Sequence, residues 1–269
     1  MKRSTRSFLG RLLIGGLLLQ CFSPAPATAG WYFLATTTSE QTPASANRPA
    51  QLVTAISQNR LKYATNVWTL IAHLDLQRII LVNHIRKRYW EGSLDEYFAT
   101  LAQQLQDSQQ KAEKMLHVMP LEQSQRLRTF SRADPFDPLL PTLEITVQKA
   151  ADQVSLIGHT AQKHEVRRNG EPYEEVWVAA DIHLGNDLDE HKRKMFVGKL
   201  QQTRTTPPGA VLAELTEVVT AGYPLKTVNL VSRVTKEVVK VQQQQFTDEE
   251  FAAPAGYTSS PLSETMSLR

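Results

Sequence analysis

The feature that most constrains the fold is a series of β-type segments in the first third of the chain. The series begins at Trp31–Thr38 with aromatic and β-branched residues, a composition that favours strands. Three further segments of this kind follow at Gln51–Ala64, Trp68–Leu74 and Ile79–His84. In Trp68–Leu74 the odd and the even positions are both largely apolar. Because such a strand needs cover on both faces, we expect a sheet with helices on one face and a second layer or a ligand on the other.

Two helices are predicted between the strands. Ser93 and Glu96 have the spacing of a capping box, and apolar residues then recur at helical spacing as far as Pro120. This pattern predicts a helical insertion at residues 93–119. A second helix is expected from residue 187 to about 202, with acidic residues at its start and basic residues after them, as the helix dipole favours.

Tight turns join several of the expected strands. Asp75–Gln77 is expected to turn two strands of the first half into a hairpin, and Asn169-Gly170 is a strong hairpin signal in the second half. The strands of the second half are expected at Leu143–Lys149, Val154–Arg168, Tyr173–Ala179, Leu225–Val234 and Glu237–Gln244.

Residues 1–29 have the pattern of a cleaved export signal. A positively charged start is followed by an apolar stretch and by small residues that end in Ala27-Thr28-Ala29. Cleavage after Ala29 would leave Gly30 as the first residue. The apolar run at 12–22 is shorter than the roughly 20 residues of a membrane-spanning helix, which favours a cleaved signal over an anchor. We therefore expect an exported protein of the periplasm or an equivalent lumen, with secretion into the medium as the alternative.

Removal of this signal changes the charge and the cysteine content of the protein. The whole chain carries +3, but residues 1–29 hold four basic and no acidic residues. The remainder has 26 basic against 27 acidic residues, a net charge of −1, so we expect no nucleic-acid partner. Cys21 is the only cysteine, and its loss excludes disulfides, thiolate metal sites and cysteine nucleophiles.

The rest of the chain is expected to fold as one domain at residues 30–257. It contains the helical insertion at 93–119 and a proline-rich connector at 132–141, where each proline removes a backbone donor. Residues 258–269 are expected to form a flexible tail.

Two short motifs lie near the end of the chain, Gly222–Val228 and Phe251–Tyr257. They resemble the "glPlk" strand and the "f.vPaGY" signature of an uncharacterised branch of the lipoprotein-localisation-factor (LolA-like) superfamily of exported domains. Earlier motifs agree in order: Arg60–Tyr63, Asp75–Arg78, Tyr89–Gly92 and Glu175–Val178.

The resemblance implies an α+β fold, an antiparallel, incompletely closed β-barrel (half-barrel) with helices covering the concave face. In characterised relatives the cavity receives acyl chains of lipoproteins, and no catalytic residues come with the family. The apolar strand positions that we expect to line such a cavity are Trp68, Leu70, Ile79, Leu81, Trp177 and Val228. Plain core packing is the alternative for each of them.

Signals for an enzyme are scarce. The chain has none of the glycine-rich phosphate loops, nucleophile elbows or paired-histidine zinc motifs that mark common enzyme classes. Asp181, His183 and His191 are close enough in sequence to be considered as metal ligands, with a polar turn as the alternative. We expect no catalytic residues, no metal and no cofactor.

A basic run, Arg86–Arg88, precedes Tyr89 and Trp90. It is interpreted as a solvated strand end, with transient contact to an anionic membrane surface as the remaining possibility.

Two functions from different classes fit these observations. The first is an exported, non-enzymatic protein that binds a hydrophobic small molecule, a lipid or a lipoprotein acyl chain, in a half-barrel cavity. The second is an exported structural or protein-interaction domain with a filled core, acting in envelope assembly.

Overall fold

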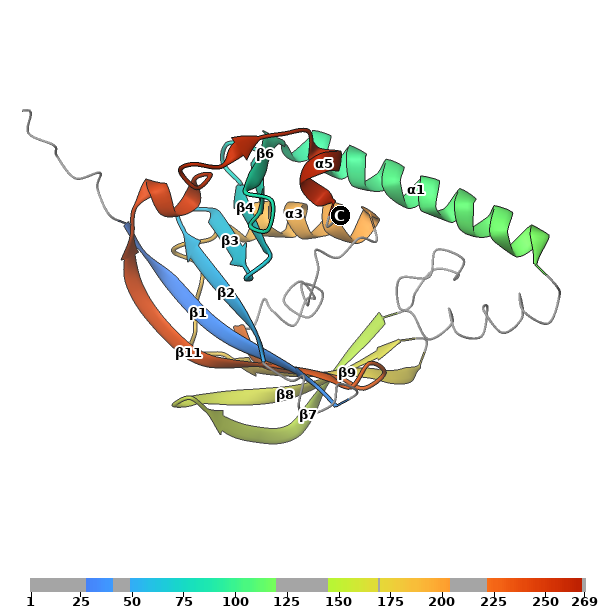
Figure 1. The fold of residues 1–269 in the computed structure, drawn as a ribbon. Helices are drawn as coiled ribbons and strands as arrows, with labels where there is room; N and C mark the ends of the chain where they lie inside the picture. The colour runs from blue at the N-terminus through green and yellow to red at the C-terminus, as the bar shows by residue number, and fades with distance from the viewer. Residues whose placement is uncertain (1–27, 41–48, 120–144, 169, 204–221, 268–269) are drawn as a thin grey trace, which may run out of the picture.

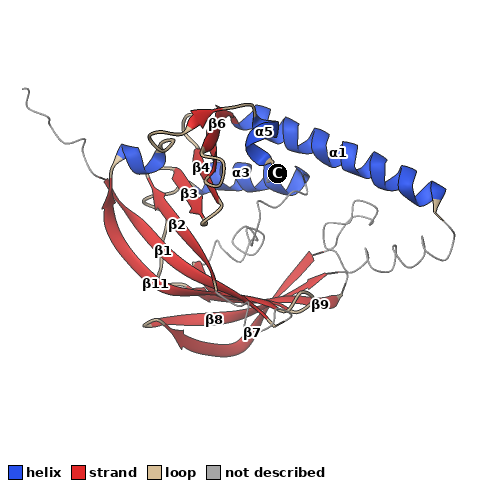
Figure 2. Ribbon diagram, viewed as in Figure 1, coloured by secondary structure: helices blue, strands red, loops and turns tan. Residues whose placement is uncertain are grey.

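The computed structural model describes residues 28–40, 49–119, 145–168, 170–203 and 222–267 (Figure 1). Most of the predicted export signal and the whole proline-rich connector at 132–141 lie outside these residues. The described elements are mainly strands, with helices gathered near one end of the sheet (Figure 2). No described helix combines the length and the apolar character needed to cross a membrane.

The first half of the chain forms six strands and a long helix. Its elements are β1 (Thr28–Ser39), β2 (Ala50–Ser57), β3 (Arg60–Ala64), β4 (Trp68–His73), β5 (Arg78–Asn83), β6 (Arg88–Ser93) and α1 (Leu94–Val118). The hairpin at Asp75–Gln77 is confirmed between β4 and β5. The prediction of a single strand at Gln51–Ala64 is wrong, because Gln58 and Asn59 turn the chain with φ angles of 49° and 57°.

The helix α1 starts where its cap predicts. The hydroxyl of Ser93 accepts a hydrogen bond from the backbone N–H of Glu96 at 3.1 Å. This bond satisfies one of the N–H groups that a helix start leaves unpaired. The helix then runs to Val118, close to the expected end before Pro120.

Within its described residues, the second half of the chain adds the remaining strands and three short helical segments. Its elements are β7 (Ile145–Leu156), β8 (His159–Arg168), β9 (Glu171–Ala179), α3 (Glu190–Thr203), β10 (Tyr223–Asn229), β11 (Val234–Phe246), η2 (Asp248–Phe251), β12 (Thr258–Ser259) and α5 (Leu262–Met266). The expected strand Val154–Arg168 is in fact the end of β7 and the whole of β8, because Ile157 and Gly158 form a turn with φ angles of 45° and 87°.

The twelve strands found in the described residues form one sheet, in the order β12-β6-β5-β4-β3-β2-β1-β11-β10-β9-β8-β7. Every pairing is antiparallel except the short parallel one between β12 and β6. The two outermost strands, β12 and β7, lie at opposite ends of this order, so the sheet is open. The predicted antiparallel, incompletely closed sheet is confirmed at this level.

Pairing of β1 with β11 joins the two ends of the chain at the middle of the sheet. The register runs from Thr28 opposite Phe246 to Ser39 opposite Val234, with one bulge after Leu34. Both strands are long and run from the β2–β6 part of the sheet towards the β7–β9 part (Figure 1). The two halves of the sequence are therefore connected through main-chain hydrogen bonds rather than through side chains alone.

One face of the sheet carries the larger apolar cluster, which we call the inner cluster. Strand alternation places Leu70 and Leu81 on this face, opposite each other on β4 and β5. The first turns of α1 and one residue of α3 pack into the same cluster. The inner cluster includes Phe33, Leu52, Ile56, Leu61, Leu70, Ile79, Leu81, Trp90, Leu94, Tyr97, Phe98, Leu101, Phe196, Tyr223, Leu225 and Leu262.

The opposite face carries a second apolar cluster, the outer cluster. It is formed by Ala55, Ile71, Ile80, Val82, Phe246 and Phe251, with Tyr32, Tyr89 and Tyr257 packed against it. The alternate residues of β4 and β5 therefore enter two different cores. This confirms the prediction that both faces of these strands are covered.

The C-terminal segment supplies the cover on the outer face and then passes to the inner one. We call residues 247–267 the C-terminal clasp. Phe251 enters the outer cluster, β12 pairs with the edge of β6, and Leu262 of α5 enters the inner cluster. The buried amide of Asn83 donates hydrogen bonds to the carbonyls of Thr265 and Ser267 at 3.0 and 3.1 Å.

Residues 258–267 were expected to belong to a flexible tail, but the structure places the strand β12 and the helix α5 there. Few apolar residues lie in this stretch, and composition alone favours a loop. Leu262 and Thr265 are nevertheless 6% and 0% exposed, because the segment wraps around the edge strand β6 and meets partners on both faces.

The clasp should contribute substantially to stability. Phe251 is 1% exposed, and truncation of a buried Phe to Ala typically costs about 3–5 kcal/mol. We expect Phe251→Ala to lower the free energy of unfolding by about that amount in a urea titration. Leu76→Ala is the control, because that side chain is 65% exposed and its loss should change the free energy by less than about 0.5 kcal/mol. Equal unfolding midpoints for the two variants would contradict the role of the clasp.

Candidate functional site

The structure brings together five of the six residues predicted to line a cavity. Leu70, Ile79 and Leu81 are 4%, 0% and 8% exposed and belong to the inner cluster. Trp68 and Trp177 are half-buried and pack against the same cluster. All five positions follow from the period-two alternation of their strands.

Val228 does not join the other five. It is half-buried and belongs to none of the three apolar clusters among the described residues. A register shift between Pro224 and Lys226 interrupts the pairing of β10 with β9. Beyond this shift Val228 pairs with Glu175, so it lies on the same face of the sheet as Trp177 but farther along β9 from the inner cluster.

Aromatic side chains that are only partly covered lie around the inner cluster. We call this set the aromatic margin, and it consists of Trp31, Tyr63, Trp68 and Trp177. Sequence reasoning identified only two of the four. The signal for the others was present, because Trp31 lies in the aromatic start of β1 and Tyr63 directly opposes Leu70.

A chain of aromatic contacts connects the two helices to the sheet. Trp90 of β6 stacks on Tyr97 of α1, Tyr97 meets Phe98 edge-on, and Phe98 meets Phe196 of α3 at 5.9 Å between ring centroids. Burial raises the pKa of the Tyr97 hydroxyl to about 12. The helices are thus fixed to the inner cluster by aromatic packing near the start of α1.

Charged side chains lie close to Trp177, a member of the aromatic margin. The ammonium groups of Lys163 and Lys226 lie 5.7 and 5.6 Å from its ring centroid. Glu175 pairs with Lys163 at 2.8 Å, and this ion pair raises the pKa of the lysine. The aromatic margin therefore combines apolar surface with positive charge beside Trp177.

A polar junction connects the hairpins of the first half to α3. The side-chain amide of Asn59 donates to the carboxylate of Asp75 at 3.1 Å, and its oxygen accepts from the backbone N–H of Asp189 at 2.6 Å. Lys192 pairs with the same Asp75 carboxylate, and this hydrogen bond lowers the pKa of Asp75. No sequence motif marks these residues, because they come from three separate segments.

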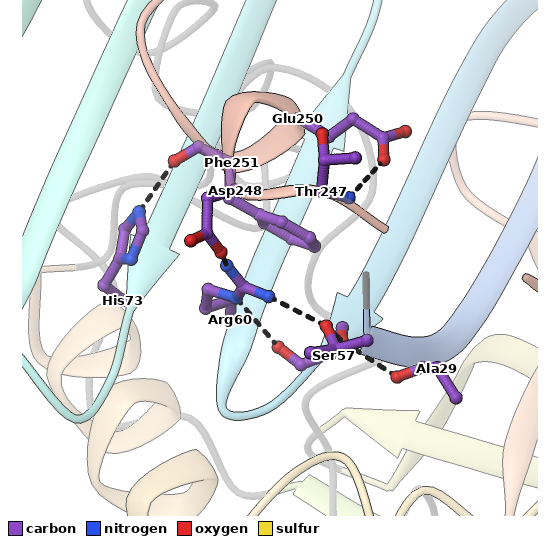
Figure 3. Close-up of polar contacts among 9 residues, drawn as sticks. Ala29, Ser57, Arg60, His73, Thr247, Asp248, Glu250 and Phe251 are labelled. Atoms are coloured by element: carbon purple, nitrogen blue, oxygen red, sulfur yellow. Dashed lines mark hydrogen bonds and ion pairs between the residues drawn. The ribbon is translucent and has the colours of Figure 1, made fainter. Parts of the chain in front are cut away.

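The clasp is attached to the sheet by a row of hydrogen-bonding side chains on β3 and β4 (Figure 3). The guanidinium of Arg60 pairs with Asp248 at 2.7 Å and lies 4.5 Å from the ring centroid of Phe251. His73 donates through Nε2 to the carbonyl of Phe251 at 2.8 Å, which assigns its tautomer. Burial lowers the pKa of His73, so this imidazole is held in its neutral form more strongly than an exposed one.

Asp181, His183 and His191, which were considered as metal ligands from their spacing, do not form a metal-binding group in the described residues. Asp181 pairs with His159 at 2.8 Å, a partner that the spacing did not suggest, and this hydrogen bond lowers the pKa of Asp181. His191 lies at the start of α3, beyond the turn that follows β9. Within the described part of the chain, no group of three or more acidic, histidine or cysteine side chains is arranged to hold a metal ion.

The basic run Arg86–Arg88 lies at the start of β6, as expected for a strand end. The two aromatic residues that follow it pack against the sheet. Tyr89 lies against the outer cluster and Trp90 lies in the inner one. Arg88 pairs with Glu264 of the clasp at 2.6 Å. These rings are therefore engaged in the two cores rather than set out together on one surface.

Glu174 on β9 has the most perturbed carboxyl group described. Burial raises its pKa to about 7, and the positive charge of Lys236 opposes that rise. A folded-state pKa above the unfolded value favours the protonated folded form, so the contribution of Glu174 to stability is present below about pH 4.5 and is lost as the pH rises through 7.

Glu174→Gln should remove this pH dependence. The difference in the free energy of unfolding, variant minus wild type, should increase by about 2 kcal/mol between pH 5 and pH 8. Urea titration of both proteins at each pH measures it. Glu171→Gln on the same strand is the control, because its side chain is exposed and its difference from wild type should stay constant. A constant difference for Glu174→Gln as well would show that the carboxyl group is not perturbed.

Comparison with known proteins identifies a family but no activity. Two solved structures of PNGF-II, in space groups C2 and P21, are similar to this chain with TM-scores of 0.37 and 0.36 and sequence identities of 9% and 10%. They align with 88% and 87% of this chain, which spans 32% of the PNGF-II chain, and a likeness this low does not show a shared fold. No curated protein matches the sequence.

The family match covers more than half of the chain, from α1 to Tyr257 of the clasp. The matching family and the PNGF-II structures are not named as LolA-like, so the relationship to the LolA-like superfamily stays a prediction. Residues 98–257 match the model of a domain of unknown function, DUF4412, and the chain belongs to this family.

Proposed function

We propose that this protein is an exported, non-enzymatic binding protein that holds a lipid or a lipoprotein acyl chain in a half-barrel cavity. The observation that carries the proposal is the aromatic margin. Trp31, Tyr63, Trp68 and Trp177 pack on the inner cluster yet keep part of their surface uncovered. Large apolar rings that pack on a core and keep part of their surface uncovered are typical of a surface that receives an apolar partner.

In this proposal the helices cover the concave face of a LolA-like half-barrel. Tyr97 and Phe98 of α1 and Phe196 of α3 pack on the inner cluster, which supports such a cover. Among the side chains that the structure describes, these contacts come from the start of α1 and from Phe196 of α3. Separation of the helices from the sheet would leave the pairing of β1–β6 in place. The ligand would enter between the helices and the aromatic margin.

A structural or protein-interaction domain of the envelope is the second candidate. Its support is the close packing of Leu70, Ile79 and Leu81, which are almost fully buried as in a filled core. The far end of α1 also exposes Met115 and Val118, at 57% and 83% of their surface. Those side chains would contact a protein partner or, transiently, a membrane surface.

Titration with a fluorescent fatty acid separates the two candidates. We expect saturable uptake by detergent-free protein, and Trp68→Ala and Trp177→Ala should each weaken binding by about tenfold, because each removes a large apolar contact. Tyr89→Ala is the matched control, since this half-buried ring lies on the outer cluster and its loss should leave affinity unchanged.

Two results would count against the binding proposal. The first is absence of uptake by folded protein, verified by circular dichroism. The second is an equal loss of affinity in Tyr89→Ala and the two tryptophan variants, since that would place binding elsewhere. Recovery of a stable protein partner without any ligand uptake would favour the structural candidate.

A further inference from the structure

The strand β1 begins two residues before the expected cleavage site of the export signal. Thr28 and Ala29 are paired with Phe246 and Gln245 of β11. Cleavage after Ala29 would remove both residues from a strand that lies in the middle of the sheet.

Side chains of β2 and β3 also form hydrogen bonds with these two residues. The hydroxyl of Ser57 donates to the carbonyl of Ala29 at 2.9 Å and lies 2.9 Å from the hydroxyl of Thr28. Arg60 donates to the same Thr28 hydroxyl at 3.1 Å, beside its ion pair with Asp248 (Figure 3). Because Ser57 is 0% exposed, loss of Thr28 and Ala29 would leave a buried hydroxyl without these partners.

The position of Gly30 also argues against a new N-terminus there. Gly30 is buried, whereas Thr28 is half-buried and Ala29 is exposed. A Cβ at Gly30 would lie 2.4 Å from the carbonyl oxygen of Ile56, so the backbone passes very close to β2 at this point. An α-ammonium group at Gly30 would place a positive charge in this enclosed position, and burying a charge is costly.

The sequence offers a second cleavage site that avoids both costs. Ala25-Pro26-Ala27 has the same A-x-A pattern as Ala27-Thr28-Ala29, shifted two residues towards the N-terminus. Cleavage after Ala27 leaves Thr28, Ala29 and all their described contacts in the mature protein.

We propose that the exported chain is cut between Ala27 and Thr28, so that the mature protein begins with Thr28. A signal peptidase that reads the A-x-A pattern would hydrolyse this peptide bond with one water molecule. The carbonyl carbon of Ala27 takes the oxygen and leaves as a carboxylate, and the nitrogen of Thr28 becomes the new α-ammonium group. This inference rests on the proposed export of the protein.

The first test is the N-terminal sequence and the intact mass of protein exported from a bacterial host with its own leader. We expect a chain that starts at Thr28 and is heavier than a Gly30 chain by one Thr and one Ala residue. An exported chain that starts at Gly30 would overturn the site while leaving the export proposal intact. A chain that keeps residues 1–27 and stays in the cytoplasm would overturn both.

A matched pair of variants tests the site without relying on the mass alone. Ala25→Arg alters only the A-x-A pattern that ends at Ala27, and Ala29→Arg alters only the one that ends at Ala29. We expect processing to slow severalfold in Ala25→Arg, followed by pulse labelling, and to proceed to a Thr28 start in Ala29→Arg. Blocked processing in Ala29→Arg with normal processing in Ala25→Arg would contradict the proposal.

Discussion

The pairing of β1 with β11 is the constraint on which the rest of the structure depends. It joins residues near the start of the described chain to residues near its end, and it links β2–β6 to β7–β10 in one sheet. Closing so long a loop has an entropic cost that only the completed pairing offsets. Gly30 and the buried Ser57 hydroxyl lie at the tightest part of this junction, so the N-terminal end of β1 has little tolerance for a shorter chain.

Two cores, one on each face of β2–β6, follow from this arrangement. Residues at the start of α1 and Phe196 of α3 pack into the inner cluster, and Phe251 of the C-terminal clasp packs into the outer one. The clasp also occupies the free edge of β6 through β12, and covered edges do not template pairing with other chains. Arg60 connects the start of β1 to the clasp, because it contacts Thr28 of β1 and both Asp248 and Phe251 of the clasp.

Local sequence signals predicted the elements that carry their own chemistry. The cap at Ser93 located the start of α1, and the two-face apolar pattern of Trp68–Leu74 predicted cores on both sides of β4. The turn at Gln58–Asn59 was missed because neither residue is glycine or proline, and its support comes from distant Asp189.

The fixed structure of the clasp and the separation of Val228 from the inner cluster could not be predicted from the sequence. The clasp is fixed by partners such as Asn83 and His73, which lie far away in the sequence. Val228 shares a face with Trp177 but lies beyond it along the strands, and the sequence does not indicate how far the inner cluster extends. In the candidate site, period-two alternation correctly grouped Leu70, Ile79 and Leu81, but the half-buried state of Trp31 and Tyr63 depends on the packing of the whole sheet.

Binding of an apolar ligand against the inner cluster is the central functional claim. It is tested most directly by native mass spectrometry of the protein, expressed with its own leader and purified without detergent. We expect a population carrying the mass of one lipid or acyl chain, released when the protein is unfolded. Folded protein that carries no added mass, and acquires none after incubation with lipid, would contradict it.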